Sequence, residues 1–166
     1  TEDRYLEIIS AKTAALFAAA CQISGVVAER DEKAEEALAS YGRYLGIAFQ
    51  LVDDAIDYVS DAETMGKNAG DDFRDGKITL PVILAYARGS AEDRAFWQAA
   101  MSGRAAGDAE LARAGELLRS TNAVADTMAR ARHYGQRAID VLAGFPKGPA
   151  RDALTETVEF AIHRAY

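Results

Sequence analysis

The stretch between residues 41 and 59 constrains the fold of this chain most, because it is strongly apolar and yet carries three carboxylates. Its large apolar side chains recur at steps of three and four residues, at Leu45, Phe49, Val52, Ile56 and Val59. This period predicts an α-helix, and the additional apolar residues between them predict burial on most of its sides. Gly42 and Gly46 are expected to leave the remaining side bare. The chain therefore has to build a helical core around this segment.

The composition favours the same class of fold. Alanine supplies 35 of the 166 residues, against 8 valines and 9 isoleucines, and there are only 3 prolines. Alanine is the strongest helix former, whereas valine and isoleucine favour strands. We therefore expect an all-α fold, with residues 1–166 forming a single domain.

Helical patterns fill nearly the whole chain. The predicted helices cover residues 3–28, 31–61, 81–88, 91–101, 109–120, 122–143 and 149–165. The pattern stops over residues 62–76, where three glycines predict a loop. The longest uncharged run, residues 13–28, is short for a membrane span and contains Gln22 and Ser24, so we expect a buried helix there.

The charge and the cysteine content exclude several classes of function. The formal net charge is -7, which is unlike a general nucleic-acid binder. Cys21 is the only cysteine, so the chain can form no internal disulfide. We expect a cytoplasmic protein with no nucleic-acid partner and no membrane span.

Three carboxylates, Asp53, Asp54 and Asp57, fit a buried helix least well. Asp53 and Asp57 are one turn apart, and Asp54 lies about 100° around the helix from Asp53. Gln50 lies one turn before them on the same side. Ionised carboxylates in apolar surroundings are costly, and Mg²⁺ bound by one or two of them removes that cost. The alternative is a solvated helix face, but the apolar flanks and Gln50 favour a metal site.

Positive charge stands close to this helix in the sequence. Lys67 and Lys77, two of only five lysines, lie beside glycines in the following loop. Glycine lets a loop approach a phosphate closely, and lysine offers it a compact charge. Ordinary solvated lysines are the alternative, which we would favour for an isolated loop. Lys12, beside Thr13 in the most apolar helix, either extends its ammonium to solvent or directs it into a cavity.

Together these segments resemble the C-terminal half of the trans-isoprenyl (polyprenyl) diphosphate synthases. Residues 49–57 look like the family's second aspartate-rich motif, residues 66–81 like the loop after it, and Lys12-Thr13 like its Lys-Thr pair. Asn68 replaces the proline that usually follows the Gly-Lys pair of this loop. The family's first aspartate-rich motif, with the basic residues that bind isopentenyl diphosphate, has no counterpart here. The resemblance therefore covers one half of a synthase.

The resemblance implies a helical bundle of the isoprenoid synthase type around a deep cavity. It implies the Mg²⁺-assisted condensation of isopentenyl diphosphate with an allylic diphosphate, and a homodimer, the missing N-terminal half, or both as partners. The implied metal ligands are Asp53, Asp54 and Asp57. The implied catalytic and substrate-binding residues are Lys12 and Lys67 for the diphosphate, Thr13 and Gln50 for the allylic cation, and Lys77 for added positive charge.

A second class of function stays open. The chain could be a non-catalytic helical subunit or scaffold that retains the family motif. Such a subunit is expected to lose Asp53 or Lys67, and this chain keeps both. Terpenoid cyclases are a further alternative, against which the Gly-Lys-x-x-Gly loop argues. We expect this half alone to be inactive, and its residues leave the product length open.

Overall fold

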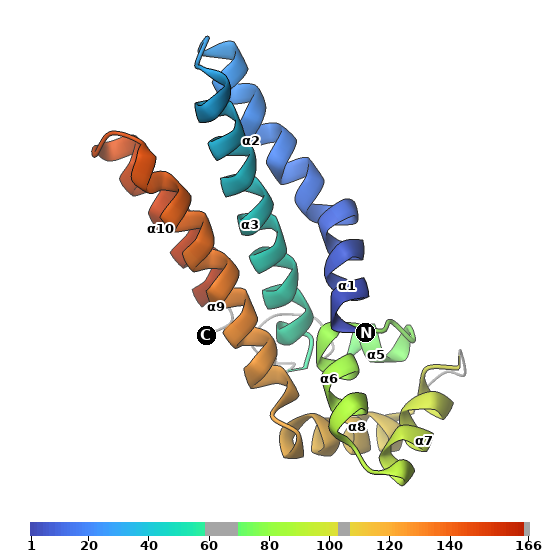
Figure 1. Cartoon of the computed structure of the whole chain (residues 1–166). Helices are drawn as coiled ribbons and strands as arrows, with labels where there is room; N and C mark the ends of the chain where they lie inside the picture. The colour runs from blue at the N-terminus through green and yellow to red at the C-terminus, as the bar shows by residue number, and fades with distance from the viewer. Residues whose placement is uncertain (59–69, 103–106, 165–166) are drawn as a thin grey trace. The chain divides into compact units, whose positions relative to one another are not determined.

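A computed structural model describes residues 1–58, 70–102 and 107–164 of the chain. All of its regular structure in these ranges is helical, which confirms the predicted fold class (Figure 1). The N-terminal elements are α1 (Glu2–Ile9), a π-helical turn (Ser10–Ala14), α2 (Ala15–Val27) and α3 (Glu32–Ile56). The later elements are α5 (Asp71–Arg74), α6 (Leu80–Arg88), α7 (Ala91–Ala100), α8 (Asp108–Ser120), α9 (Ala123–Val141), a 3₁₀ turn (Leu142–Gly144) and α10 (Pro149–His163).

The helices form two compact units. The first unit comprises Thr1–Tyr5 and Asp53–Met128, and the second comprises Leu6–Val52 and Ala129–Tyr166. The helix α3 contributes to both, because the boundary between the units falls within it. Its residues up to Val52 belong to the second unit, and those from Asp53 on belong to the first. The single domain expected from the sequence stays a prediction.

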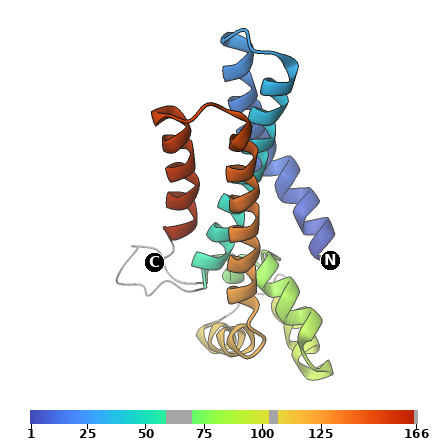
Figure 2. The same ribbon diagram turned by 60° about the vertical axis from the view of Figure 1, so that its left-hand side comes forward.

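The second unit is built around α3. Figures 1 and 2 show α9 and α10 as a neighbouring pair, joined by the short turn that follows residue 144. The buried residues of this core come from α3, α9, the 3₁₀ turn and α10, and they are Tyr41, Leu45, Ala138, Leu142, Val158, Ala161 and Ile162. The Tyr41 hydroxyl donates a hydrogen bond of 2.9 Å to the Leu154 carbonyl, which ties α3 to α10. Of the apolar stripe predicted for this helix, Leu45 belongs to this core and Phe49 packs against it.

Two glycines let α2 approach α3 closely. A Cβ atom at Gly42 would lie 2.3 Å from the Phe17 carbonyl oxygen, and one at Gly46 would lie 2.7 Å from the Cα atom of Ala14. Real Cβ atoms do not come this near to a neighbouring backbone. The side that Gly42 and Gly46 leave without side chains is therefore filled by the backbone of α2 and of the turn before it.

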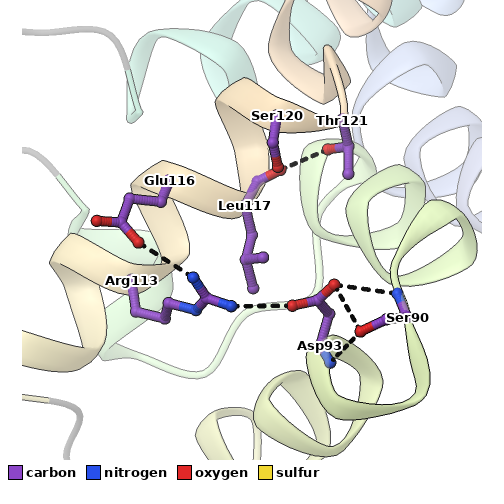
Figure 3. A network of polar contacts seen from close by, with 7 residues as sticks. All are labelled: Ser90, Asp93, Arg113, Glu116, Leu117, Ser120 and Thr121. Carbon is purple, nitrogen blue, oxygen red and sulfur yellow. Dashed lines mark hydrogen bonds and ion pairs between the residues drawn. The ribbon is translucent and has the colours of Figure 1, made fainter.

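The first unit packs α6, α7 and α8 together. Its largest buried rings, Phe73 and Trp97, meet edge to face with centroids 6.1 Å apart. Ser90 caps α7 by accepting a hydrogen bond from the Asp93 amide. The Asp93 carboxylate also lies 3.1 Å from Arg113 of α8, so the cap and an ion pair share one side chain (Figure 3). These contacts fix the short helices that follow the candidate site in the chain.

The run Glu2–Val27 has more exposed apolar surface than expected. Among the described residues it alone is long and apolar enough to cross a membrane, judged by length and composition. Core helices of water-soluble bundles share these properties. Only 17% of its most apolar stretch is buried. The prediction that residues 13–28 form a buried helix is thus wrong for most of its surface, since burial is confined largely to the side of α2 that faces α3.

Candidate functional site

The three carboxylates predicted as metal ligands lie at the C-terminal end of α3 in three different environments. Asp53 is exposed, Asp54 is completely buried and Asp57 is half-buried. The Asp57 amide donates to the Asp53 carbonyl over 3.3 Å, which confirms that these two are one turn apart. Neighbouring helical side chains diverge by about 100°, so Asp53 and Asp54 leave the helix in different directions.

Asp54 has a partner that the sequence did not reveal. The hydroxyl of Tyr5, near the start of α1, donates a hydrogen bond to the Asp54 carboxylate, and both side chains are buried. Burial raises the pKa of Tyr5, and the negative charge of Asp54 raises it further. The phenol therefore stays protonated and keeps its role as donor. Its only signal in the sequence is a helical spacing of four from the buried Ile9, which is typical of any core residue.

Asp57 is connected to the segment that begins at Gly70. Its carboxylate accepts a hydrogen bond of 3.1 Å from the Asp72 amide, and its carbonyl accepts one of 2.8 Å from the Gly70 amide. Burial, followed by the nearby Asp72 carboxylate, raises the pKa of Asp57 to about 6. The amide of Asp72 opposes that shift in part. Burial and the neighbouring carboxylate together thus disfavour the ionised form of Asp57.

Lys77 is the cation that the structure brings to this cluster. Its ammonium lies 2.9 Å and 3.0 Å from the two carboxylate oxygens of Asp72. Partial burial lowers the pKa of Lys77, but the bond to Asp72 and the charges of Asp54 and Asp53 outweigh it, and the pKa is raised overall. Sequence analysis assigned no role to Asp72. Its amide donates a hydrogen bond to Asp57, and its carboxylate accepts one from Lys77.

A second group of predicted residues lies in the other unit. The Thr13 hydroxyl donates a hydrogen bond of 3.0 Å to Oε1 of Gln50, although 37 residues separate them. Lys12 and Thr13 both occupy the π-helical turn, and the Lys12 side chain is exposed. Single π turns inside helices are rare and are frequent at functional sites. The remaining predicted residue, Lys67, lies outside the described residues.

The donor chemistry at the end of α3 suits a divalent cation. Mg²⁺ takes one or two carboxylates and completes its shell with water and substrate phosphate oxygens. Asp53 and Asp57, one turn apart, fit that requirement, and a bound cation would favour the ionised form of Asp57, which burial disfavours. Asp54 fits less well, because it is buried against Tyr5. The described residues contain no cluster of three or more acidic, histidine or cysteine side chains arranged to hold a metal by themselves.

Comparisons with known proteins agree on one family. Residues 1–118 match the family model described as polyprenyl synthetase. The chain is 39% identical over 164 residues to octaprenyl diphosphate synthase of Escherichia coli, and 36% identical over 167 residues to a short chain isoprenyl diphosphate synthase of Methanothermobacter thermautotrophicus. These alignments cover 99% and 100% of this chain and 50% of each relative. The chain therefore spans about half the length of the curated relatives it matches.

A solved structure extends this agreement to the fold. The polyprenyl synthase of Caulobacter crescentus, solved in complex with calcium and isoprenyl diphosphate, is 47% identical to the chain with a TM-score of 0.92. The match covers 100% of this chain and 51% of that one. The helices described above thus have the isoprenoid synthase fold, as one half of it. By sequence and by fold, the chain belongs to the polyprenyl synthetase family.

Proposed function

We propose that this chain supplies the half of a trans-polyprenyl diphosphate synthase that activates the allylic diphosphate. The observation that carries the proposal is the cluster at the end of α3, where Asp53, Asp57 and Asp72 lie with Lys77. Carboxylates next to a lysine are the groups that recognise a metal-bound diphosphate. Family membership supports the same conclusion. The single cysteine supports a reducing compartment, the cytoplasm.

In this proposal Asp53 and Asp57 hold Mg²⁺, which when bound neutralises negative charge on the diphosphate. The Asp72 amide holds the Asp57 carboxylate in one orientation. The Lys77 ammonium, paired with Asp72 in the ligand-free chain, adds positive charge to the leaving group. As the allylic carbon–oxygen bond breaks, the electron pair leaves with the diphosphate, and these charges stabilise it.

The second group of residues has proposed roles on the same substrate. Lys12 and Lys67 bind its diphosphate, and the oxygens of Thr13 and Gln50 stabilise the allylic cation. The hydrogen bond between Thr13 and Gln50 supports this assignment, because it orients Oε1 of the amide. Isopentenyl diphosphate then attacks the cation and a proton is lost. A homodimer also stays a prediction.

The proposal names a class of product and no chain length. The relatives reported above include an octaprenyl and a short chain synthase at nearly equal identity, 39% and 36%. Similarity at this level does not separate the two products. The substrates proposed for this chain are accordingly an allylic diphosphate and isopentenyl diphosphate.

Binding of inorganic pyrophosphate tests the proposed site on the chain alone. We expect calorimetry to detect binding with Mg²⁺ present and little or none without it. Asp57→Asn should weaken this binding, because it removes a carboxylate from the cluster. Glu36→Gln is the matched control, since Glu36 is an exposed carboxylate on α3 about six turns before Asp57. Equal binding by both variants would contradict the proposal.

The alternative, a non-catalytic helical subunit, makes a different prediction. Such a subunit would raise the activity of a separate synthase through its surface, without using its own carboxylates. Its effect on a partner enzyme would then be the same with Asp57 or with Asn at that position. Loss of the effect in Asp57→Asn favours the catalytic half.

A further inference from the structure

A cavity of about 400 Å³ lies in the second unit, near the starts of α3 and α10. Figures 1 and 2 show the turn before α3 and the turn before α10 at the same end of this unit. The cavity is lined by Arg30, by Leu38 of α3 and by residues between 142 and 154. Its volume is within the range of small-molecule sites, roughly 300–1,000 Å³.

One part of the lining is apolar and is continuous with the core. Leu142 is completely buried, and Phe145 and Leu154 pack against the core cluster of the second unit. Leu38 is half-buried on the opposite helix. The hydrogen bond from Tyr41 to the Leu154 carbonyl holds α10 to α3 beside these residues. This apolar floor offers a ligand a place to bury an aliphatic group.

The charged part of the lining has one sign. Arg30, Lys147 and Arg151 line the cavity, and the described residues around it include no carboxylate, although the chain has 26 acidic and 19 basic residues. Within the described ranges none of these three cations forms an ion pair. The carboxylate of Asp31, which follows Arg30, accepts a hydrogen bond of 2.8 Å from the Ala34 amide. The cavity therefore combines an apolar floor with a cationic rim.

Arg151 joins these two parts of the lining. Its half-buried guanidinium donates a hydrogen bond of 3.2 Å to the Phe145 carbonyl, which holds the side chain against the turn. Arginine carries five N–H donors in a fixed fork, so further donors are available to an anion. The start of α10 adds to this preference, because no side chain caps it and its dipole favours negative charge. Asp152 in that first turn is exposed and does not line the cavity.

We propose that this cavity binds an anionic amphiphile, a molecule with a phosphate or carboxylate head and an aliphatic chain. The head lies at Arg30, Lys147 and Arg151, and the chain lies on the apolar floor. The site is separate from the one proposed for the allylic substrate. Leu38 and Gln50 are twelve residues apart on α3, which corresponds to about 18 Å along the helix. The inference does not rest on the proposed function.

A free amphiphile fits the cavity better than a lipid in a bilayer. Insertion into a bilayer uses apolar side chains that stand out from the surface. Among the described residues, none of the exposed large apolar side chains lines this cavity. Its apolar groups are instead the half-buried and buried side chains of the floor, which a single aliphatic chain can reach.

Calorimetry with alkyl phosphates of increasing length tests the inference on the whole chain. A chelator removes Mg²⁺, so that the proposed diphosphate site is not measured. We expect weak binding of inorganic phosphate and tighter binding of butyl, hexyl and octyl phosphate, by at most roughly fourfold for each buried methylene. The gain should stop once the chain fills the cavity. Octyltrimethylammonium, which has the same tail and the opposite charge, should not bind.

Two pairs of substitutions locate the site. Arg30→Gln with Lys147→Gln removes two exposed cations of the rim and should weaken octyl phosphate binding by roughly tenfold or more. Lys33→Gln with Arg132→Gln is the matched control. It changes the net charge equally, and both residues are exposed and lie outside the cavity lining, so binding should change by less than about twofold. Circular dichroism melting checks that both variants stay folded.

Several results would overturn the inference. These are equal binding by the two double variants, an affinity that keeps rising with tail length, and binding of octyltrimethylammonium as tight as that of octyl phosphate. Binding to phosphatidylglycerol vesicles without any affinity for octyl phosphate would show attraction to a charged surface only. Loss of octyl phosphate binding in Asp57→Asn would place the ligand at the end of α3. Loss of binding after fusion to the half of the Caulobacter crescentus polyprenyl synthase that this chain does not match would show that the cavity is filled in a complete synthase.

Discussion

The hydrogen bond from Tyr5 to Asp54 joins the first helix to the aspartate-rich segment, and its removal gives the first prediction. Tyr5→Phe keeps the ring and deletes the donor to a completely buried carboxylate. Loss of a partner for a buried acceptor costs about 1–3 kcal/mol of unfolding free energy. Urea unfolding followed by circular dichroism measures this loss.

Tyr86→Phe is the control for that measurement. The Tyr86 hydroxyl takes part in a hydrogen bond of 3.0 Å with Gln98 at the surface, where water replaces a lost partner. We expect a change below about 0.5 kcal/mol. Equal effects of the two substitutions would show that the Tyr5 hydroxyl does not support Asp54.

The raised pKa of Asp57 predicts how stability depends on pH in the absence of metal. The pKa is 3.8 in the reference state and about 6 in the folded chain, chiefly because of burial. Folding therefore favours the protonated form, so the stabilising contribution is complete below pH 3.8 and is lost as the pH rises through about 6. Unfolding of the chain and of Asp57→Asn between pH 4.5 and pH 7.5, values chosen as roughly spanning that window, tests this.

The expected signature is a difference between the two proteins that changes with pH. The chain should lose stability relative to Asp57→Asn as the pH rises, because asparagine does not ionise. A constant difference across the range would mean that Asp57 has an ordinary pKa in the folded chain.

At the scale of the helices, the close contact between α2 and α3 gives a third prediction. Gly42→Ala places a Cβ atom 2.3 Å from the Phe17 carbonyl oxygen, so the two helices must move apart. Overpacking of this kind costs about 1–3 kcal/mol of unfolding free energy.

Gly115→Ala in α8 is the control, because its Cβ atom would meet only the flexible Arg119 side chain at 3.4 Å. Alanine is the better helix former there and should stabilise by about 0.5–1 kcal/mol. Thermal melts showing the same sign for both would contradict the packing described here.

The helices could be predicted from the sequence, but their ends depend on contacts between distant residues. The second helix was expected to reach Asp61, whereas α3 ends at Ile56. There the Asp57 carbonyl accepts a hydrogen bond from Gly70, thirteen residues later, and its carboxylate accepts one from Asp72. No local pattern in the sequence predicts those two hydrogen bonds. The one-turn helix α5 inside the predicted loop and the π turn around Lys12 depend on tertiary structure in the same way.

The candidate site was predictable where it consists of unusual residues in a regular pattern. Carboxylates in an apolar helix stand out, and so do glycine-flanked lysines. Tyr5 does not, because a buried tyrosine has no special spacing. The resemblance included Asp72 in the loop after the motif, but the sequence could not reveal its contacts with Asp57 and Lys77. The spacing of Asp53, Asp54 and Asp57 also could not reveal that one of them is sealed from solvent against a phenol.

At the scale of the whole molecule, the chain spans about half the length of its curated relatives, and only 17% of the most apolar stretch of Glu2–Val27 is buried. The prediction of a buried helix over residues 13–28 was wrong for most of its surface, because an apolar sequence does not specify which sides of a helix its neighbours cover. Since the relatives are about twice as long as the matched region, the catalytic claim is measured most directly with the unmatched half of a relative supplied.

The most direct measurement is turnover of a chimera that joins this chain to the half of the Caulobacter crescentus polyprenyl synthase it does not match. The account predicts Mg²⁺-dependent incorporation of isopentenyl diphosphate into a longer allylic diphosphate. Asp53→Ala should lower turnover by roughly a hundred- to a thousandfold with little change in KM, because charge on the leaving oxygens grows toward the transition state. Glu36→Gln should behave like the parent chimera. Near-normal turnover of Asp53→Ala at every Mg²⁺ concentration would contradict the account.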